Sequence, residues 1–574
     1  MRFAALAVDY DGTLASHGRV FPETVRSLKR FAASGRKLLL VTGRELEELI
    51  GIFPEIGVFD RVVAENGALL FYPRTGARKP LGIPPPPEFV SELVRRGVDP
   101  LSVGDSIVAT VTPNEKIVLE TIRDLGLELQ VIFNKGAVMV LPPGVNKASG
   151  LATALDDMKL SARNVAAIGD AENDHALLRS AEFGVAVANA LPMLKRDADR
   201  TSAHAHGAAV SELIDAILAD DLRAWAQGTS RRAILLGYRQ DRTPVCIAPA
   251  RCNLLLAGPS GSGKSVYAAG ILERLAEKGY QYCAVDPEGD YADLPGAVVL
   301  GSAEREPSPE EVVTALENPH TNVVINLSGL AADERPAAFK QLIARLAALR
   351  ATCGRPHWVV IGEAQFLLPA EDSEAAFKPD EPSPSMMYVS VHPDSMSPVV
   401  LDSVDALIGI GANPGATLAK YCTPLGIACA APSDLSLRPG EAVAWMRRAG
   451  DAPYRFAMQP SEAERKQHRR RLVEGQLPAE RSFYFRGAQK KLNLRAQNLP
   501  LFLQIGMGVD EETWLHHLRQ GDYSRWLQES VKDPRLATEV AEVERSAADA
   551  AASRARVTAI LEKYMKAADE RATP

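Results

Sequence analysis

Two short segments of this sequence carry groups that handle phosphate, and they belong to different chemistries. Asp9 and Asp11 lie two residues apart within Ala7–Leu14, directly after an apolar stretch. Gly258–Ser265 spells G-P-S-G-S-G-K-S, a complete G-x-x-x-x-G-K-S loop that follows the apolar run Leu254–Leu256. The first segment predicts metal-assisted attack on a phosphate ester, and the second predicts a nucleoside-triphosphate site.

The composition bounds the class of protein. With 574 residues the chain is too long for one hydrophobic core, so about three or four domains are expected. The formal net charge of −7 gives no molecule-wide field that would attract nucleic acid. No apolar stretch approaches the roughly 20 residues of a membrane-spanning helix, and no signal pattern precedes the first strand. We therefore expect a cytoplasmic protein whose six cysteines are reduced thiols rather than zinc ligands or disulfides, since none forms a C-x-x-C pair.

Apolar runs divide the chain into α/β regions and a helical end. Strand candidates alternate with amphipathic helical stretches over residues 1–80 and 146–222, which is typical of a parallel sheet with crossover helices. Residues 81–145 open on a proline run and interrupt this rhythm, which predicts an inserted α/β module. A second α/β domain is expected over 232–458, and a mainly helical domain over 480–574.

Carboxylates and phosphate donors follow several predicted strands of the first region. An aspartate after such a strand, like Asp9 or Asp11, faces the crevice in which open α/β sheets bind ligands. One carboxylate could attack phosphorus while the other protonates the leaving oxygen. Two acids beside a phosphate need a cation, and further acids lie in Gly169–Asp174. Thr42 and Lys147 are candidate donors to the phosphoryl oxygens.

This ordered set of motifs resembles the haloacid dehalogenase (HAD) superfamily, specifically its Cof-like and sucrose-phosphatase-like sugar phosphatases, over roughly residues 1–220. The motifs are D-Y-D-G-T-L at Asp9–Leu14, V-T-G-R at Val41–Arg44, E-N-G-A at Glu65–Ala68, N-K at Asn146-Lys147 and G-D-A-E-N-D at Gly169–Asp174. The resemblance implies a HAD-type Rossmannoid parallel sheet with an inserted α/β cap between E-N-G-A and N-K. An Asp-Gly turn alone could produce the first motif, but motifs in this order, each after a strand, favour the phosphatase interpretation.

The resemblance also implies a role for each matching residue. Asp9 would be the nucleophile that forms an aspartyl-phosphate, and Asp11 the general acid/base. Thr42 and Lys147 would hold the phosphoryl group. The implied Mg²⁺ ligands are Asp9, Asp11 through its carbonyl, and Asp170, with Asp174 in support. Candidate substrate contacts are Gly43, Arg44 and Asn173.

The glycine-rich loop, Gly258–Ser265, is expected to bind ATP together with Mg²⁺. Successive backbone N–H groups in such a loop point at the phosphates, and the helix that follows adds a favourable dipole. Lys264 would reach the β- and γ-phosphates, and Ser265 would ligate Mg²⁺. The residues expected to contact the nucleotide are Gly258, Ser260, Gly261, Ser262, Gly263, Lys264, Ser265, Val266 and, from a later strand end, Glu363.

The segments around this loop resemble the HerA/FtsK-like ATPases, ring-forming motors with a RecA-like P-loop fold, over about residues 232–458. The resemblance rests on D-P-E-G-D-Y at Asp286–Tyr291 and on G-E-A-Q at Gly362–Gln365, each after an apolar strand. In that family the later strand ends in D-E-A-H or similar, where the Asp orients the metal-bound water and the Glu activates the attacking water.

The chain departs from that pattern at one position. Gly362 stands where the family has Asp, whereas Glu363 remains. Phosphoryl transfer depends mainly on positioning and charge, so losing a metal-directed carboxylate weakens it. The sequence therefore predicts ATP binding with weak hydrolysis, or a nucleotide that is a structural or regulatory ligand, rather than brisk turnover. Asp286 or Glu288 could substitute for the missing acid.

The last hundred residues favour a small helical domain. Phe483–Arg486 and Lys490–Arg495 put aromatics beside bases, a pattern that nucleic-acid binders use for stacking and phosphate contact. We favour the simpler interpretation, in which the aromatics form a core and the bases a solvated rim. An alanine- and charge-rich helix is expected over Asp533–Lys566.

The favoured function is a Mg²⁺-dependent phosphatase of a small, sugar-phosphate-like phosphomonoester, assembled or regulated by an ATP-binding HerA-like domain. A cap that closes over compact substrates and excludes polymers supports this hypothesis. One alternative is a nucleic-acid end-processing or defence enzyme, in which a DNA or RNA phosphatase is coupled to a ring ATPase. Another is a non-catalytic scaffold held together by nucleotide. The HerA resemblance implies a homo-oligomer, with a hexamer favoured, and no membrane partner is expected.

Overall fold

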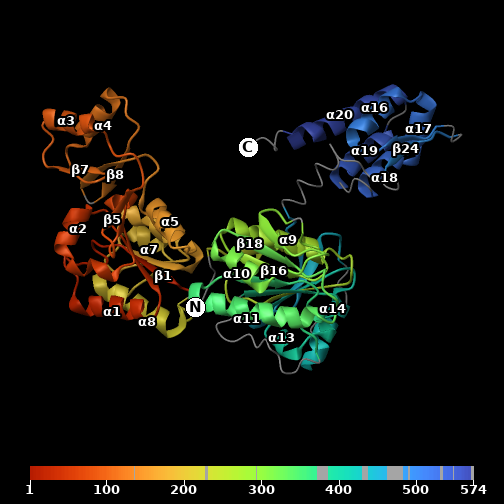
Figure 1. Ribbon diagram of the computed structural model, residues 1–574. Coiled ribbons are helices and arrows are strands. Elements are labelled where there is room, and N and C mark those ends of the chain that lie inside the picture. Colours follow the sequence, from red (N-terminus) through yellow and green to blue (C-terminus); the bar gives the residue numbers. More distant parts are fainter. Residues whose placement is uncertain are drawn as a thin grey trace. The chain divides into compact units, whose positions relative to one another are not determined.

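The computed structural model describes most of the chain (Figure 1). Described are residues 1–569 apart from 135, 226–230, 293, 371–384, 429–436, 462–481, 489–491, 530–533 and 547–548. The chain divides into two compact units, Met1–Gln459 and Pro460–Pro574. Within the described ranges, no helix combines the length and the apolar character that crossing a membrane requires.

The first unit opens with a sheet whose described strands follow the order β12-β11-β10-β1-β2-β3-β4-β5. The bounds are β1 (Ala5–Val8), β2 (Lys37–Val41), β3 (Arg61–Ala64), β4 (Leu69–Tyr72), β5 (Ala77–Pro80), β10 (Val165–Gly169), β11 (Phe183–Ala186) and β12 (Arg200–Thr201). The strands from β12 to β3 run parallel, and β4 and β5 are antiparallel. Both faces of a parallel sheet are covered, which explains why β1 and β10 consist almost wholly of buried apolar residues.

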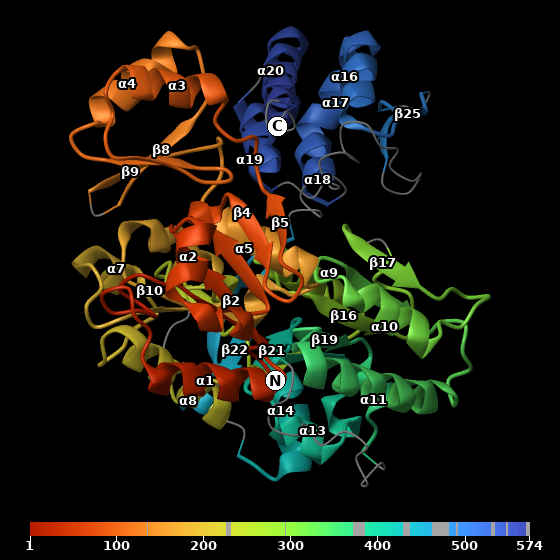
Figure 2. The same ribbon diagram turned by 60° about the vertical axis from the view of Figure 1, so that its left-hand side comes forward.

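Helices of periodic apolar sequence cover this sheet. They are α1 (Pro22–Ala33), α2 (Leu46–Ile52), α5 (Lys147–Asp157), α6 (His175–Ser180), α7 (Pro192–Asp197) and α8 (His206–Asp220). In α1, Val25, Leu28 and Phe31 recur at three-residue spacing, so they lie on one face of the helix and are buried. Helices α1 and α8 pack side by side, as two views show (Figures 1 and 2).

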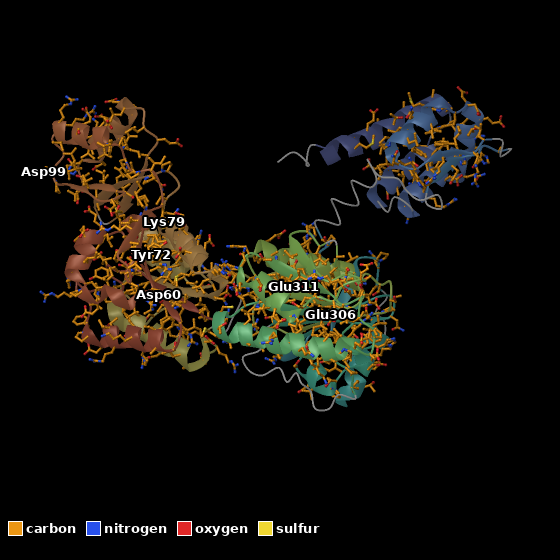
Figure 3. All side chains as sticks on the ribbon, viewed as in Figure 1. Asp60, Tyr72, Lys79, Asp99, Glu306 and Glu311 are labelled. Atoms are coloured by element: carbon orange, nitrogen blue, oxygen red, sulfur yellow. The ribbon has the colours of Figure 1, made fainter. Side chains whose placement is uncertain are left out.

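A second, smaller sheet is inserted between β5 and α5, and it forms a cap with its own core. Its strands are β6 (Leu101–Val103), β7 (Val108–Val111), β8 (Gln130–Asn134) and β9 (Ala137–Leu141), and its helices are α3 (Pro87–Arg95) and α4 (Glu115–Asp124). All strand pairs are antiparallel, in the order β6-β7-β9-β8. Phe89, Leu93 and Val118 from the helices pack with strand residues in that core. In Figure 3, Asp99 marks the cap and Tyr72 marks the first sheet.

The second α/β region of the same unit is built on a larger mixed sheet. Its described strands follow the order β14-β13-β23-β22-β21-β15-β20-β19-β16-β18-β17. The bounds are β13 (Ile234–Tyr238), β14 (Pro244–Ile247), β15 (Leu254–Ala257), β16 (Tyr282–Asp286), β17 (Ala297–Leu300), β18 (Asn322–Asn326), β19 (Trp358–Ile361), β20 (Ser385–Ser390), β21 (Ala406–Ile410), β22 (Glu441–Met446) and β23 (Tyr454–Met458). The strands from β21 to β17 run parallel, with β15 between β20 and β21.

The helices of this region connect the parallel strands. They are α9 (Lys264–Glu277), α10 (Pro309–Glu317), α11 (Arg335–Cys353), α12 (Ala364–Leu367), α13 (Pro398–Asp402) and α14 (Pro414–Leu425). Helix α9 follows β15 directly, with Gly258–Ser265 forming the turn and the first helical residues. The described cysteines, which are Cys246, Cys252, Cys283, Cys353 and Cys422, are free thiols, and Cys429 lies outside the described residues.

The two α/β regions meet through buried polar contacts. Glu182, whose side chain is 2% exposed, accepts from Arg2 Nη2 at 2.8 Å. The Tyr280 hydroxyl of the second region donates to the other carboxylate oxygen of Glu182, also at 2.8 Å. Nearby, His357 Nε2 lies 3.0 Å from Asn164 Oδ1. Buried polar groups that satisfy one another in this way join the two regions into one compact unit.

The C-terminal unit is mainly helical. It contains β24 (Phe483–Phe485), β25 (Leu494–Ala496), α16 (Leu499–Gly508), α17 (Glu511–Gln520), α18 (Asp522–Glu529), α19 (Pro534–Ser546) and α20 (Ala550–Asp569). Phe483 and Phe485 are buried in an aromatic core with Phe502, Trp514 and Trp526, as the simpler interpretation of this segment predicted. Lys490 and Lys491 lie outside the described residues.

The single helix expected over Asp533–Lys566 is wrong, because two helices, α19 and α20, occupy this stretch. The second begins with an acidic cap: Asp549 Oδ1 accepts from the backbone N–H of Ala552 at 2.7 Å. Such a cap favours the start of a new helix, so this stretch contains two helices rather than the one continuous helix that its alanine-rich composition suggests.

Candidate active site and the glycine-rich loop

Three neighbouring strands of the first sheet deliver polar side chains to one edge. Strand β1 lies between β10 and β2, and the three run parallel. Asp9 follows β1, Thr42 follows β2, and Asp170 follows β10. Because parallel strands end at the same edge, residues far apart in the sequence come together there.

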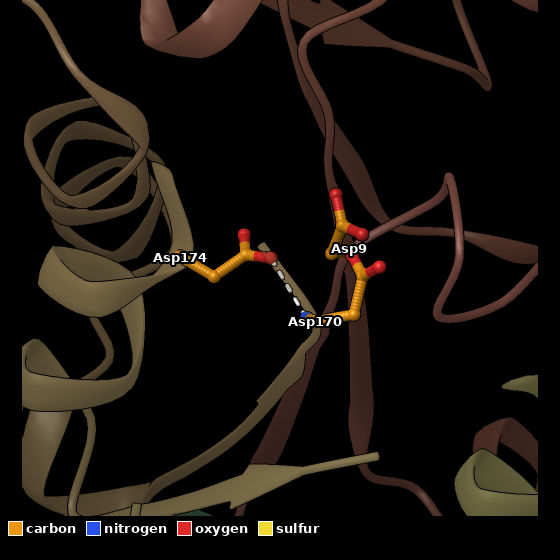
Figure 4. A group of neighbouring side chains, drawn as sticks. All are labelled: Asp9, Asp170 and Asp174. Carbon is orange, nitrogen blue, oxygen red and sulfur yellow. Dashed lines mark hydrogen bonds between the residues drawn. The ribbon is translucent and has the colours of Figure 1, made fainter. Parts of the chain in front are cut away.

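Asp9, Asp170 and Asp174 form a cluster whose ligand atoms lie within 4.8 Å of one another (Figure 4). All are buried, with exposures of 3%, 4% and 0%. Asp174 Oδ2 accepts from the backbone N–H of Asp170 at 2.9 Å and from that of Ala171 at 3.0 Å. Asp174 therefore shapes the turn that carries Asp170, besides offering its other oxygen to the site.

Lys147 joins the nucleophile candidate to this turn. Its Nζ donates to Asp9 Oδ1 at 2.6 Å and to Asp174 Oδ1 at 2.7 Å. Lys147 is the first residue of α5, and Asn146 caps that helix by accepting from the N–H groups of Ala148 and Ser149. The N-K motif thus combines a helix cap with a buried ammonium group.

The charge of the acidic cluster is suited to a cation. Burial, reinforced by the charge of Asp174, raises the pKa of Asp9, although Lys147 opposes this shift. Burial would lower the pKa of Lys147, but Asp174 and Asp9 outweigh it and raise that pKa. Lys147 pairs with Asp9 and Asp174, and Asp170 lies beside them in the same buried cluster of carboxylates. Carboxylate oxygens are the ligands that Mg²⁺ prefers, so the donor set and its charge fit that ion.

The side chain of Asp11 is engaged elsewhere. Its carboxylate forms a bidentate pair with Arg44, whose Nε and Nη2 donate at 2.6 and 2.7 Å. The carboxylate of Asp11 is therefore not part of the buried cluster, and the expectation that its carbonyl binds Mg²⁺ stays a prediction. Thr42 is fully buried and its Oγ1 accepts from the N–H of Arg44 at 3.1 Å.

Gly12 explains why the first motif needs glycine after its second aspartate. Its φ of 84° lies in the left-handed region. A Cβ at this position would lie 2.2 Å from Asp170 Oδ2. Any other residue would push Asp170 out of the cluster, so the motif connects backbone geometry with the acidic site.

A cavity of about 340 Å³ opens above this cluster, between the first sheet and the cap. Asp9, Asp11, Arg44, Lys147 and Asp170 line its core side. The lining also includes Gly43 and Asn173, the other candidate substrate contacts. Asn173 Nδ2 donates to Asn66 Oδ1 at 3.0 Å, and its own Oδ1 is buried without a hydrogen-bond partner in the described part of the chain.

Sequence reasoning missed the cap side of the cavity and the link between cap and core. The cap contributes Ser102, Ile107, Thr110, Asn134 and Met139, none of which lies in a recognisable motif. The link is Glu65 of the E-N-G-A motif, whose oxygens accept from the N–H groups of Asp105 at 2.9 Å and Ser106 at 2.6 Å. The position of Glu65 in a motif was the one available signal, but its partners in the cap depend on the folded chain.

The glycine-rich loop lies at the carboxyl end of β15. Lys264 is 5% exposed, and its Nζ donates to the carbonyl of Pro259 in the same loop at 3.0 Å. Ser265 Oγ donates to Asp290 Oδ2 at 2.7 Å. Ser262 Oγ is buried without a partner among the described residues. The other expected contacts are arranged around these groups: Gly258 at the end of β15, Ser260, Gly261 and Gly263 in the turn, and Val266, 44% exposed, in α9.

Glu363 reaches the same edge of the second sheet, after β19. It has a left-handed φ of 43° and precedes α12. Its Oε2 accepts from Gln365 Nε2 at 2.6 Å, and Gln365 Oε1 accepts from Ser390 Oγ at 2.7 Å. Burial lowers the pKa of Lys264, and the negative charges of Glu363, Asp290 and Glu288 oppose this shift.

Comparison with known proteins identifies the first region. Residues 6–77 and 108–214 match the family described as haloacid dehalogenase-like hydrolase. A phosphoglycolate phosphatase from Methanothermobacter thermautotrophicus is 32% identical over 216 residues, which are 37% of this chain and 96% of that protein. Phosphoglycolate phosphatase 2 from Saccharolobus solfataricus is 31% identical over 232 residues, covering 37% of this chain and 91% of that protein. A solved haloacid dehalogenase-like hydrolase from Bacteroides thetaiotaomicron is 20% identical, covers 38% of this chain and 99% of its own, and has a TM-score of 0.34.

The chain therefore belongs to the haloacid dehalogenase-like hydrolases through its N-terminal region. That region is a phosphatase domain of the HAD type with an acidic cluster suited to a metal ion. The matched family segments end at residue 214, ahead of the second α/β region.

Proposed function

We propose that the N-terminal region hydrolyses a small phosphomonoester through Asp9. The observation that carries this proposal is the position of Asp9 at the floor of the cavity, 2.6 Å from the ammonium group of Lys147 and within the acidic cluster. Bound Mg²⁺ would be held by Asp9 and Asp170 and would offset negative charge on the phosphoryl group. Lys147 would add a second positive charge against the same oxygens.

The chemistry divides into two displacements. In the first, an Asp9 oxygen bonds to phosphorus, the ester P–O bond breaks, and Asp11 gives its proton to the leaving oxygen. In the second, Asp11 takes a proton from water as the water oxygen bonds to phosphorus and the bond between phosphorus and the Asp9 oxygen breaks, which releases inorganic phosphate and regenerates the Asp9 carboxylate. Asp11 begins paired with Arg44 at the cavity wall, so substrate entry must rearrange that pair.

For the substrate, we propose a compact phosphomonoester, with 2-phosphoglycolate as the first candidate. The cavity of about 340 Å³ is small, since ligand sites span roughly 300–1,000 Å³. Arg44 lines it, and a guanidinium group can bind a carboxylate with two hydrogen bonds. Two relatives are phosphoglycolate phosphatases, and sugar phosphates of similar size are the next candidates.

Phosphate release from a substrate panel tests this proposal. The panel contains 2-phosphoglycolate, several sugar phosphates, nucleotides and a 3′-phosphorylated oligonucleotide, each with Mg²⁺ and with EDTA. The proposal expects turnover of the compact substrates with Mg²⁺ only. Preference for the oligonucleotide would instead support the nucleic-acid end-processing alternative, and no release from any substrate would contradict a phosphatase.

We also propose that the glycine-rich loop binds ATP with Mg²⁺. The supporting observation is Lys264, which is 5% exposed yet hydrogen-bonds only its own loop within the described contacts. The acids nearby do not form a hydrogen bond to Lys264 within the described contacts, and burying an ammonium group without such a bond is costly, so an anion that reaches it would be bound favourably. Calorimetric titration with ATP tests this site, and binding that is the same in wild type and Lys264→Ala would contradict it.

A HerA-like assembly role follows from the same proposal. We propose a homo-oligomer, with a hexamer favoured, in which neighbouring copies complete each nucleotide site. Light scattering over a concentration series, with and without ATP and Mg²⁺, tests it. A monomer under every condition would contradict the assembly role but leave nucleotide binding as a property of one chain.

A further inference from the structure

The turn after β16 brings an acid to the glycine-rich loop. Asp286 ends β16, and its Oδ1 accepts from the N–H groups of Glu288 at 3.3 Å, Gly289 at 2.9 Å and Asp290 at 3.1 Å. Its Oδ2 accepts from the N–H of Tyr291 at 2.8 Å. These bonds, with Gly289 at a φ of 83°, fold the turn tightly. The carboxylate of Asp286 is thus committed to the backbone, and the turn presents Asp290 to Ser265.

The same turn fills the space beside Gly362, where the resemblance led us to expect an acid. A Cβ on Gly362 would lie 3.3 Å from the carbonyl oxygen of Val285, 3.4 Å from Pro287 Cδ and 3.5 Å from Tyr291 Cε2. A methyl group would be tight there, and a carboxymethyl group would have to pass Pro287 and Tyr291. The folded turn after β16 therefore occupies the space that a side chain at position 362 would need, which accounts for glycine at the end of β19.

We propose that Asp290 supplies the carboxylate that holds the divalent cation beside Ser265, in place of an acid at position 362. This assignment rests on the proposed binding of nucleotide by the glycine-rich loop. It is supported by the 2.7 Å hydrogen bond between Ser265 Oγ and Asp290 Oδ2. Two further groups of the same loop independently indicate a ligand at this place: the nearly buried Lys264, and Ser262 Oγ, which is buried without a hydrogen-bond partner in the part of the chain that the structure describes.

The charge of Asp290 gives the assignment a distinctive consequence. With Mg²⁺ present, the carboxylate attracts the cation and strengthens binding of the nucleotide that carries it. Without Mg²⁺, the same carboxylate repels the triphosphate at short range. Asp290→Asn should therefore weaken binding of Mg-ATP and strengthen binding of metal-free ATP, a reversal of sign that loss of a merely structural contact would not produce.

Calorimetry on the full chain tests this consequence, with ATP titrated once in MgCl₂ and once in EDTA. The variants are Asp290→Asn, Glu288→Gln as the rival acid of the same turn, and Glu277→Gln as the matched control. Glu277 is exposed at the far end of α9, roughly 18 Å along the helix from Ser265, so its loss changes the charge equally but remotely. Phosphate release by each variant serves as the check that the chain is folded.

The assignment expects the ratio of Mg-ATP affinity to ATP affinity to fall at least tenfold in Asp290→Asn and to stay at the wild-type value in the two glutamine variants. Three results would overturn the assignment while leaving the nucleotide site in place. They are an unchanged ratio in Asp290→Asn, a ratio that falls only in Glu288→Gln, and a wild type that binds ATP equally well with and without Mg²⁺. Failure of the wild type to bind ATP in either buffer would instead overturn the proposed nucleotide site, and this assignment with it.

Discussion

The two α/β regions both place a lysine and acids at the carboxyl ends of parallel strands, but they arrange these charges differently. In the hydrolase region, Lys147 already bridges Asp9 and Asp174 within a buried cluster. In the second region, Lys264 contacts its own loop, and the acid opposite it, Asp290, is exposed on a neighbouring turn. In the first region the lysine and the acids are therefore already paired with one another. In the second region, Lys264 has no carboxylate in hydrogen-bond contact among the described residues, which is why we propose that it binds an anion.

The largest expected effect concerns the paired site. Asp9→Asn removes the nucleophile and one metal-directed charge, so phosphate release should fall by at least about 10³-fold. Steady-state release from 2-phosphoglycolate or an aryl phosphate measures it, with ATP binding as the control for folding. Activity close to wild type would remove Asp9 from the mechanism.

The next effect concerns the contact between the two α/β regions. Glu182→Ala removes the buried carboxylate that accepts from Tyr280 of the second region and that pairs with Arg2 and Arg163 of the first region, and breaking such a buried pair costs about 3–5 kcal/mol. The midpoint of urea unfolding should fall accordingly, with Glu277→Ala as an exposed control. If the midpoint does not move, the regions are not joined through Glu182.

A smaller effect is expected at the glycine-rich loop. Lys264→Ala removes charged hydrogen bonds worth about 1.5–3 kcal/mol, so ATP affinity should fall roughly 10- to 150-fold. Phosphate release should persist, because Lys264 takes no part in the Asp9 cluster. Loss of both functions in a folded variant would show that the two sites depend on each other.

The smallest expected effect concerns a single hydrogen bond in the contact between the two α/β regions. Tyr280→Phe deletes the hydroxyl that donates to Glu182 at 2.8 Å but leaves the bond from Arg2. Unfolding should become easier by about 1.5 kcal/mol, the lower end of the range for a hydrogen bond to a charged group. A loss as large as that of Glu182→Ala would mean that the Tyr280 hydroxyl, rather than Arg2, accounts for most of what Glu182 contributes, and no loss would mean that the hydroxyl adds nothing to this contact.

The sequence predicted what depends on local pattern. The apolar runs placed β2 at Lys37–Val41 and put Asp9, Thr42 and Asp170 at strand ends, because buried parallel strands are continuous apolar segments. Once those strands lie side by side, the acids must meet. The inserted module was visible for a similar reason, since its proline run broke the alternation of strands and helices.

The rest depended on turns and on contacts distant in sequence. Asp290 lies within a recognised motif, yet only the fold of its turn over Asp286 shows that it reaches Ser265. Likewise, the partners of Glu65 and the cap wall of the cavity come from segments whose mutual placement no periodicity encodes. The break between α19 and α20 was not predicted, because a single capping aspartate is a weak signal within an alanine-rich stretch.

The central claim, that Asp9 forms a covalent bond to phosphorus, can be tested by trapping that intermediate. The full chain would be mixed with 2-phosphoglycolate and Mg²⁺, quenched rapidly in acid, digested and analysed by mass spectrometry. We predict a phosphoryl adduct on the peptide that contains Asp9, absent when EDTA replaces Mg²⁺ and absent in Asp9→Asn. A phosphoryl group found on another residue, or undiminished turnover by Asp9→Asn, would contradict the account.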